Sequence, residues 1–338
     1  MKYTRDILFQ RHRLSQQQID RWLGENRSME FIHDKVKQLN EMKHFIAVTD
    51  RLRENSISFI CIKGPLLSYR IYNDATVRFS HDIDLLIKPE QLDSTLNLLF
   101  EDNFQFTEGN SWPREKVKQN LIVKTIHHVS LYNKESKFCV EIHWTLMHGV
   151  PVSQKKLANL VSQNQTVVNF AGREFTVLNR EFELLYLMIH GARHGWTRLK
   201  WLVDINEYPM DGMNLDLLQR LIRQLHAERI VSQTDYFLRK YFDKELPFDK
   251  QKHLPSRLIY GAQECIDRTN IELQSSTKDI FHDILYSLNL YPQWSYKWGL
   301  FSNLLVRPGD IDDHHFSSEI MYYIYRPFSF IKRRILHV

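Results

Sequence analysis

Apolar and polar residues alternate with two different periods along the chain. Between residues 57 and 144, short apolar runs rich in β-branched residues predict strands at 57–62, 82–87, 103–107, 121–132 and 137–144. Apolar residues spaced three and four apart predict helices at 66–72 and 89–100. We therefore expect a mixed β-sheet with helices on one side of it.

Helical periodicity dominates on both sides of this region. Residues 15–55 carry apolar residues at helical spacing, namely Met29, Ile32, Val36, Leu39, Met42 and Ile46, and are expected to pack against the sheet. After residue 150 a hairpin is predicted around Ala171-Gly172, followed by helices at 181–194, 197–208, 215–226, 230–242 and 255–269. The fold class is α+β: an N-terminal helical arm at 1–56, a sheet domain at 57–150, and a mainly helical domain at 151–338.

The stretch from residue 57 to residue 87 carries the most informative chemistry. Asp82 and Asp84 share one face of their predicted strand, roughly 6.6 Å apart along it, and would repel each other without a cation. Mg²⁺ prefers such hard oxygen ligands together with substrate phosphates. The turn at Lys63-Gly64 opens a short helix, whose N-terminus suits phosphate binding. A carboxylate edge facing a phosphate site is the layout that phosphoryl or nucleotidyl transfer needs.

The order strand, Lys63-Gly64, short helix, Arg78-x-Ser80-x-Asp82-Ile-Asp84-Leu resembles the polymerase-β-like nucleotidyltransferase superfamily. It is most similar to a bacterial group with a Lys-Gly and Arg-x-Ser-x-Asp-x-Asp-Leu signature. The match covers residues 57–144 well and residues 190–204 more loosely. One departure is Pro65, which follows Gly64 and lacks the N–H that other members offer to phosphate.

This resemblance implies a catalytic sheet domain and a helical domain that closes the active-site cleft. Asp82, Asp84 and Glu141 would hold two Mg²⁺ ions and be the catalytic acids. The residues expected to contact the nucleotide are Lys63, Gly64, Arg78, Ser80, Lys200 and Asp204. Two alternatives stay open: Arg78 neutralises an acid structurally, and His143, on the same face as Glu141, bonds within the core instead of touching nucleotide.

The expected reaction moves a nucleoside monophosphate, with ATP as the expected donor, to a hydroxyl or phosphate on a small molecule, a peptide or an RNA end such as tRNA. The alternative is a catalytically silent binding module with the same fold. His190 and His194 are spaced like zinc ligands, but Gly191 stands where a metalloprotease needs Glu, so a zinc-protease site is rejected. A second Asp-Ile-Asp triplet, at 310–312, is expected in an exposed loop.

Composition agrees with these expectations without deciding between them. The chain has 338 residues and a net charge of +5, which suits a phosphorylated substrate or tRNA but also an ordinary basic surface. Its three cysteines, Cys61, Cys139 and Cys265, are far apart, as expected for reduced thiols in the cytoplasm. No apolar stretch approaches the length of a membrane span. Trp294 and Trp298 are expected in the core.

Overall fold

The computed structural model describes residues 3–25, 28–80, 82–107, 112–248, 253–268, 277–304, 318, 320–325 and 328. The elements are η1 (Ile7–Arg11), α1 (Gln16–Leu23), α2 (Ser28–Glu54), β1 (Phe59–Cys61), α3 (Pro65–Tyr72), β2 (Asp82–Ile87), η2 (Pro89–Gln91), α4 (Leu92–Glu101), β3 (Phe104–Phe106), α5 (Lys116–Thr125), β4 (His128–Asn133), β5 (Phe138–His143), α6 (Gln154–Gln163), β6 (Gln165–Phe170), β7 (Arg173–Leu178), α7 (Arg180–Arg193), α8 (Leu199–Asn206), α9 (Leu215–Gln224), α10 (Glu228–Phe242), α11 (Ser256–Asp267), α12 (Thr277–Leu290) and α13 (Trp294–Leu304). The α+β class expected from the sequence is confirmed.

The described strands form one seven-stranded mixed sheet in the order β3-β4-β5-β2-β1-β7-β6. β2 runs parallel to β5 and antiparallel to β1. The hairpin of β6 and β7 was predicted as part of the mainly helical domain after residue 150. It completes the sheet instead, because β7 pairs in parallel with β1. The sheet is thus assembled from segments on both sides of residue 150.

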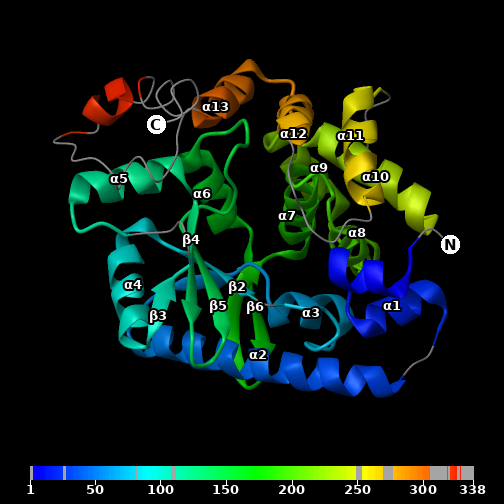
Figure 1. Cartoon of the computed structure of the whole chain (residues 1–338), viewed down its shortest axis with the longest axis horizontal. Coiled ribbons are helices and arrows are strands. Elements are labelled where there is room, and N and C mark those ends of the chain that lie inside the picture. The colour runs from blue at the N-terminus through cyan, green and yellow to red at the C-terminus, as the bar shows by residue number, and fades with distance from the viewer. Residues whose placement is uncertain are drawn as a thin grey trace.

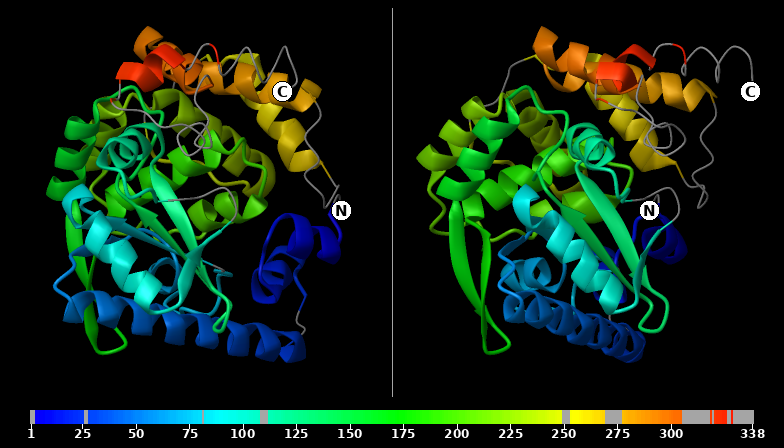
Figure 2. Two further views of the ribbon diagram at one scale, coloured as in Figure 1. Left: turned by 60° about the vertical axis from the view of Figure 1, so that its left-hand side comes forward. Right: turned by 90° about the vertical axis from the view of Figure 1, so that its left-hand side faces the viewer.

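Helices cover both faces of the sheet, so the expectation of helices on one side is wrong. On one face α2, α4 and α5 pack on apolar strand residues, and α2 crosses beneath the strands (Figure 1). On the other face α3 and α7 belong to a second apolar cluster with α8, α9 and α10. Helices α11 to α13 lie at the end of the molecule opposite α2 (Figure 2). Successive strand residues alternate between these two clusters, as a pleated sheet requires.

Three local predictions need correction. The predicted strand at 121–132 is α5 up to Thr125 and becomes β4 only at His128, because the helix buries Leu121 and Ile122 in the same apolar cluster as α2 and α4. A short apolar run cannot by itself distinguish these two outcomes.

The other two corrections concern exposed apolar residues. The N-terminal half of α2 extends past the strands, and Ile32, Val36 and Leu39 are exposed there instead of packing on the sheet. Trp294 and Trp298 lie on the peripheral helix α13 and are 82% and 73% exposed, so they are not core residues. Helical spacing correctly indicated that these residues of α2 and α13 lie on helices. It did not show which faces of those helices pack against the rest of the protein. Within the described residues, no helix is both long enough and apolar enough to cross a bilayer.

Candidate active site

Pairing of β2 with β5 brings the acidic residues together. Asp84 lies directly beside Glu141 in the parallel register. Asp82 and Asp84 are two residues apart, so their side chains lie on the same face of the sheet. His143 follows Glu141 on the same face for the same reason. This is the face that Leu86 presents to the α3 and α7 cluster, so the acids look toward the helical part of the chain.

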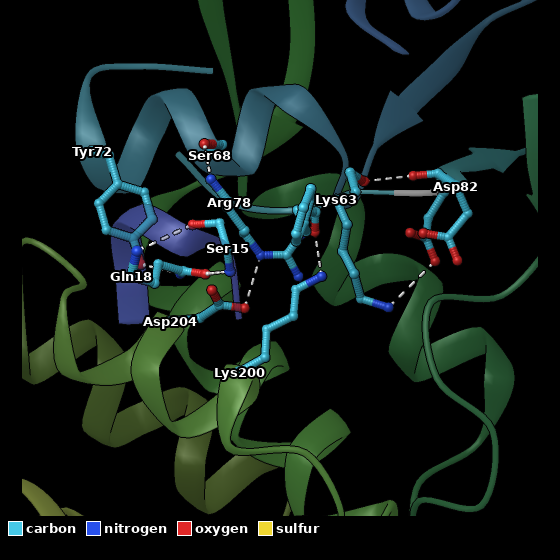
Figure 3. A network of polar contacts seen from close by, with 12 residues as sticks. Ser15, Gln18, Lys63, Ser68, Tyr72, Arg78, Asp82, Lys200 and Asp204 are labelled. Atoms are coloured by element: carbon cyan, nitrogen blue, oxygen red, sulfur yellow. Dashed lines mark hydrogen bonds and ion pairs between the residues drawn. The ribbon is translucent and has the colours of Figure 1, made fainter. Parts of the chain in front are cut away.

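The end of β1 supplies a cation to the same place. Because β1 is antiparallel to β2, it ends beside the start of β2, and the N–H of Ile62 donates to the carbonyl of Asp84 at 3.0 Å. The next residue, Lys63, places its Nζ 3.3 Å from Asp84 Oδ1. Figure 3 shows this side chain extending from the turn before α3 toward the strand that carries Asp82. Lys63 therefore lies beside the acids, and its predicted nucleotide contact stays a prediction.

His143 lies between the two neighbouring carboxylates. Its Nε2 is 3.2 Å from Asp84 Oδ1 and 3.3 Å from Glu141 Oε2. The imidazole thus contacts both acids. The sequence had left open whether His143 touches the nucleotide or bonds within the core. Nζ of Lys63 lies 5.6 Å from the ring centroid of Tyr186 of α7, so an aromatic ring covers the cation from the helical side.

The pKa values of Asp82 and Asp84 shift in opposite directions because their neighbours differ. Burial and the nearby charges of Asp84 and Glu141 raise the pKa of Asp82. Burial opposes ionisation of Asp84 too, but Lys63 and His143 outweigh it and hold the pKa of Asp84 well below its usual range. Burial likewise opposes the charge on His143, yet its hydrogen bonds to Asp84 and Glu141 raise its pKa.

These residues fit a hard divalent ion. Asp84, Glu141 and His143 each bring a ligand atom within 4.8 Å of the others, and Asp82 adds a third carboxylate on the same strand face. Carboxylate oxygens are the donors that Mg²⁺ prefers. The charges of Asp84 and Glu141 act together with burial to raise the pKa of Asp82, so the carboxylates repel one another. A divalent cation would relieve this repulsion.

Gly64 is required by the backbone as well as by any phosphate contact. It caps α3 with φ +84° and ψ −152°, a conformation that essentially only glycine adopts. A Cβ built there would lie 3.2 Å from Cγ2 of Ile83 on the neighbouring strand. The turn and β2 are thus closely packed, and Pro65 occupies the first helical position, where its missing N–H costs least. The nucleotide contact expected at Gly64 stays a prediction.

Arg78 and Asp204 form a second, fully buried centre next to the acids. Arg78 Nε donates to Asp204 Oδ2 at 2.9 Å, and the two side chains are 4% and 0% exposed. Arg78 therefore neutralises an acid, as one alternative held, but the acid is Asp204 of α8 rather than Asp82 or Asp84. Asp204, expected to line the cleft, lies inside the protein instead and anchors the Arg78 loop to the helical part (Figure 3).

Ser80 and Lys200 hold the segment that leads into β2. Ser80 Oγ donates to the carbonyl of Asp82 at 2.7 Å, while its N–H donates to Gln38 Oε1 at 3.1 Å. The Lys200 ammonium donates to the carbonyl of Phe79 (Figure 3). Burial, then the nearby Arg78, lowers the pKa of Lys200 to about 7. Both residues support the position of Asp82, and their predicted nucleotide contacts stay predictions.

The histidines around the acids were mostly missed from the sequence. His127 and His128 adjoin His143 through the antiparallel register of β4 and β5, which pairs His128 with His143. The adjacent pair His127-His128 was a usable signal, but it fell inside a wrongly predicted strand. His190 and His194 lie against Trp201, with ring centroids 5.3 and 5.2 Å from that indole.

A mixed sheet with three carboxylates on two neighbouring strands, beside a glycine turn that opens a helix, is the arrangement of the polymerase-β-like nucleotidyltransferases. The family model described as "Uncharacterised nucleotidyltransferase" matches residues 11–243, and the chain belongs to that family. The match begins in η1 and ends just after α10, so it includes the sheet, the acids and the helices that face them. A comparison with curated proteins gave no match.

Proposed function

We propose that the protein is a Mg²⁺-dependent nucleotidyltransferase that moves a nucleoside monophosphate, from ATP as the expected donor, to a hydroxyl or phosphate acceptor. The observation that carries this proposal is the pairing of Asp84 with Glu141 in parallel register, with Asp82 on the same face. The family membership of the chain supports the same reaction class.

Each site residue has a part in this proposal that its position supports. Asp82, Asp84 and Glu141 would hold two Mg²⁺ ions, which stabilise charge on the triphosphate and acidify the attacking hydroxyl. Lys63 places positive charge at Asp84, on the side where phosphate would enter. Arg78, Ser80 and Asp204 fix the segment before β2, so that Asp82 keeps its position. Catalysis of this kind depends mainly on positioning and charge stabilisation.

A second candidate is a catalytically silent module of the same fold. It is favoured by one observation: Lys63 and His143 already contact the same oxygen of Asp84, as counterions would in a site that needs no metal. The two candidates differ in what Mg²⁺ with ATP does to the protein. A metal-dependent enzyme is stabilised by the pair, since a ligand stabilises the state that binds it. The silent module gains no stability from Mg²⁺.

The test incubates the protein with each α-labelled NTP, Mg²⁺ and a fractionated cell extract, and follows where the label goes. Label in RNA indicates a tRNA-type acceptor, and label in small molecules or peptides indicates the other acceptor classes. Asp84→Asn should lower transfer by roughly a hundredfold or more, because even residues that only support metal ligands are worth about 10–100-fold. The stabilisation by Mg²⁺ with ATP should disappear in the same variant.

The control is Asp310→Asn with Asp312→Asn, which makes the same change in the same triplet. That triplet lies outside the described residues. Transfer should stay near the wild-type level. Transfer that survives Asp84→Asn and is lost in the control pair would refute the proposed site, and absence of label with every NTP would favour the silent module.

A further inference from the structure

Three imidazoles gather beside the carboxylates, where β4 begins and β5 ends. His128 and His143 are direct partners in the antiparallel register, and their rings stack with centroids 4.8 Å apart at an interplanar angle of 19°. His127 precedes β4 at a bend, and its ring meets that of His128 at 4.4 Å. One ring nitrogen from each of the three lies within 4.8 Å of the others. Strand pairing and the bend thus converge three metal-ligand side chains on one point.

The backbone holds this arrangement in place. The N–H of Trp144 donates to the carbonyl of His127 at 3.1 Å, which extends the β4–β5 ladder by one bond past His128. His148 stacks on His127, with ring centroids 5.6 Å apart and an interplanar angle of 9°. The ring of His127 therefore packs against other imidazoles as well as being held by its backbone.

Two of the imidazoles have hydrogen-bonding capacity that the protein leaves unused. Nδ1 of His128 and Nδ1 of His143 are both buried without a hydrogen-bond partner in the structure. The side chain of His143 is only 6% exposed. Buried polar atoms normally find a partner, and those that lack one call for a specific explanation such as a bound ion.

The chemistry of this cluster differs from that of the acids next to it. Imidazole nitrogens suit Zn²⁺, Co²⁺ and Ni²⁺, whereas carboxylates and water suit Mg²⁺. A Glu141 oxygen lies 4.0 Å from Nε2 of His128, so a carboxylate adjoins the imidazole cluster. Nitrogens bound to one tetrahedral Zn²⁺ lie about 3.3 Å apart, given metal–nitrogen distances of about 2.0–2.1 Å, so small ring rotations would close the site.

We propose that His127, His128 and His143 form a binding site for a borderline divalent ion of the Zn²⁺ class, beside the carboxylates Asp82, Asp84 and Glu141 proposed to hold Mg²⁺. The nearby carboxylates of Asp84 and Glu141 supply the negative charge that such an ion needs. The site does not require the proposed transfer activity, because three imidazoles and a carboxylate bind metal whether or not a nucleotide reacts. Since His143 contacts both acids, an ion on its ring brings positive charge to the edge of the candidate active site.

The test uses Co²⁺ as the probe, because imidazole-bound Co²⁺ has a visible absorption band that Mg²⁺ lacks. The full-length chain, freed of metal with a chelator, is titrated with Co²⁺ in the presence of excess Mg²⁺. We expect a band that saturates at one ion per chain, is abolished by added Zn²⁺, and is not displaced by Mg²⁺. His127→Ala and His128→Ala should each weaken Co²⁺ binding at least tenfold.

Two controls separate this site from others. His44→Ala removes a partly buried imidazole that packs on Phe138 of β5, and should leave the titration unchanged. His194→Ala removes one member of the helical pair with His190 and should also leave it unchanged. If a variant melts at a markedly lower temperature, the binding is repeated with His127→Gln, which keeps a polar side chain.

Loss of the band in His194→Ala with retention in His127→Ala and His128→Ala would overturn the proposal, as would a band that Mg²⁺ displaces. The readout is metal absorption rather than transfer, so this outcome is distinct from failure of the proposed function. A protein that transfers no nucleotide but shows the expected Co²⁺ pattern keeps this site, and one that transfers nucleotide without the pattern loses it.

Discussion

Lys200 shows how strongly a single side chain depends on its surroundings. It extends from α8 to the carbonyl of Phe79, and burial followed by the repulsion of Arg78 lowers its pKa to about 7. An ordinary lysine has a pKa near 10.4. The protein thus holds an amine whose pKa is close to neutral pH against the segment that leads into β2 and Asp82. A phosphate reaching this amine would favour its protonated form.

The stability of the protein should record this lowered pKa. Between about pH 7 and pH 10.4 the unfolded chain keeps a proton on Lys200 that the folded chain has released, so the free energy of unfolding rises with pH from this residue, by up to about 1.4 kcal/mol per pH unit. In Lys200→Met this contribution is absent. In denaturant unfolding, the free energy of unfolding of the wild type should therefore increase relative to that of the variant between pH 7.5 and pH 9.5.

Lys240→Met serves as the matched control for that measurement, because Lys240 is an exposed lysine on α10. Its pH dependence should follow that of the wild type. Identical pH profiles for wild type and Lys200→Met would contradict the lowered pKa.

The candidate site illustrates how far a sequence reaches at the scale of residues. Asp82 and Asp84 were found because strand alternation places them on one face, and Glu141 was found through the family resemblance; the structure places the three on neighbouring strands. The partner of Arg78 was not predictable, because Asp204 lies more than a hundred residues further along the chain and joins it only through helix packing. Local patterns identify residues with chemistry, but they do not show which distant residue will neutralise them.

At the scale of elements, the turn at Lys63-Gly64, where α3 begins, packs against β2, the strand that carries Asp82 and Asp84. Gly64 has a positive φ and lies close to Ile83 of β2. The sequence predicted this helix over residues 66–72, one residue after its observed start at Pro65, because Gly-Pro after an apolar run is a local signal. It could not predict the approach of β2, because strand register is a long-range property.

Gly64→Ala should destabilise the protein for both reasons. The strained backbone conformation alone costs of order 1–3 kcal/mol, and the Ile83 contact adds to it. Gly212→Ala is the matched control: φ there is +68°, but a Cβ meets nothing within 4 Å. Urea unfolding should show a clearly larger loss for Gly64→Ala than for Gly212→Ala. Equal losses would mean that the packing against β2 does not matter.

At the scale of the whole molecule, two buried ion pairs join the segment between β1 and β2 to helices α7 and α8. Arg70 of α3 bonds Glu183 of α7 at 2.7 Å, with both side chains almost fully buried, and Tyr208 donates to the same carboxylate at 2.6 Å. Arg78 bonds Asp204 of α8 in the same manner. Charges buried this deeply are costly unless paired, so the two contacts tie the sheet and the helices into one arrangement.

Asp204→Ala should therefore lower the free energy of unfolding by about 3–5 kcal/mol, since it leaves the Arg78 guanidinium buried and unpaired. Replacing both partners, as in Arg78→Met with Asp204→Leu, should recover much of that loss because no isolated charge remains. Thermal and urea unfolding of the three proteins measure this. If the double variant is no more stable than Asp204→Ala, unpaired charge is not the cause.

The parallel pairing of β1 with β7 also bears on how the protein is made. The partner of Cys61 is Val177, so β1 leaves the ribosome well over a hundred residues before the strand that covers its second edge. At about 5–20 residues per second, that edge stays open for roughly 5–25 s. During this interval the β1 backbone can pair with another nascent chain, as open strand edges do. The speed of translation between these two strands thus influences how much of the protein reaches its folded form.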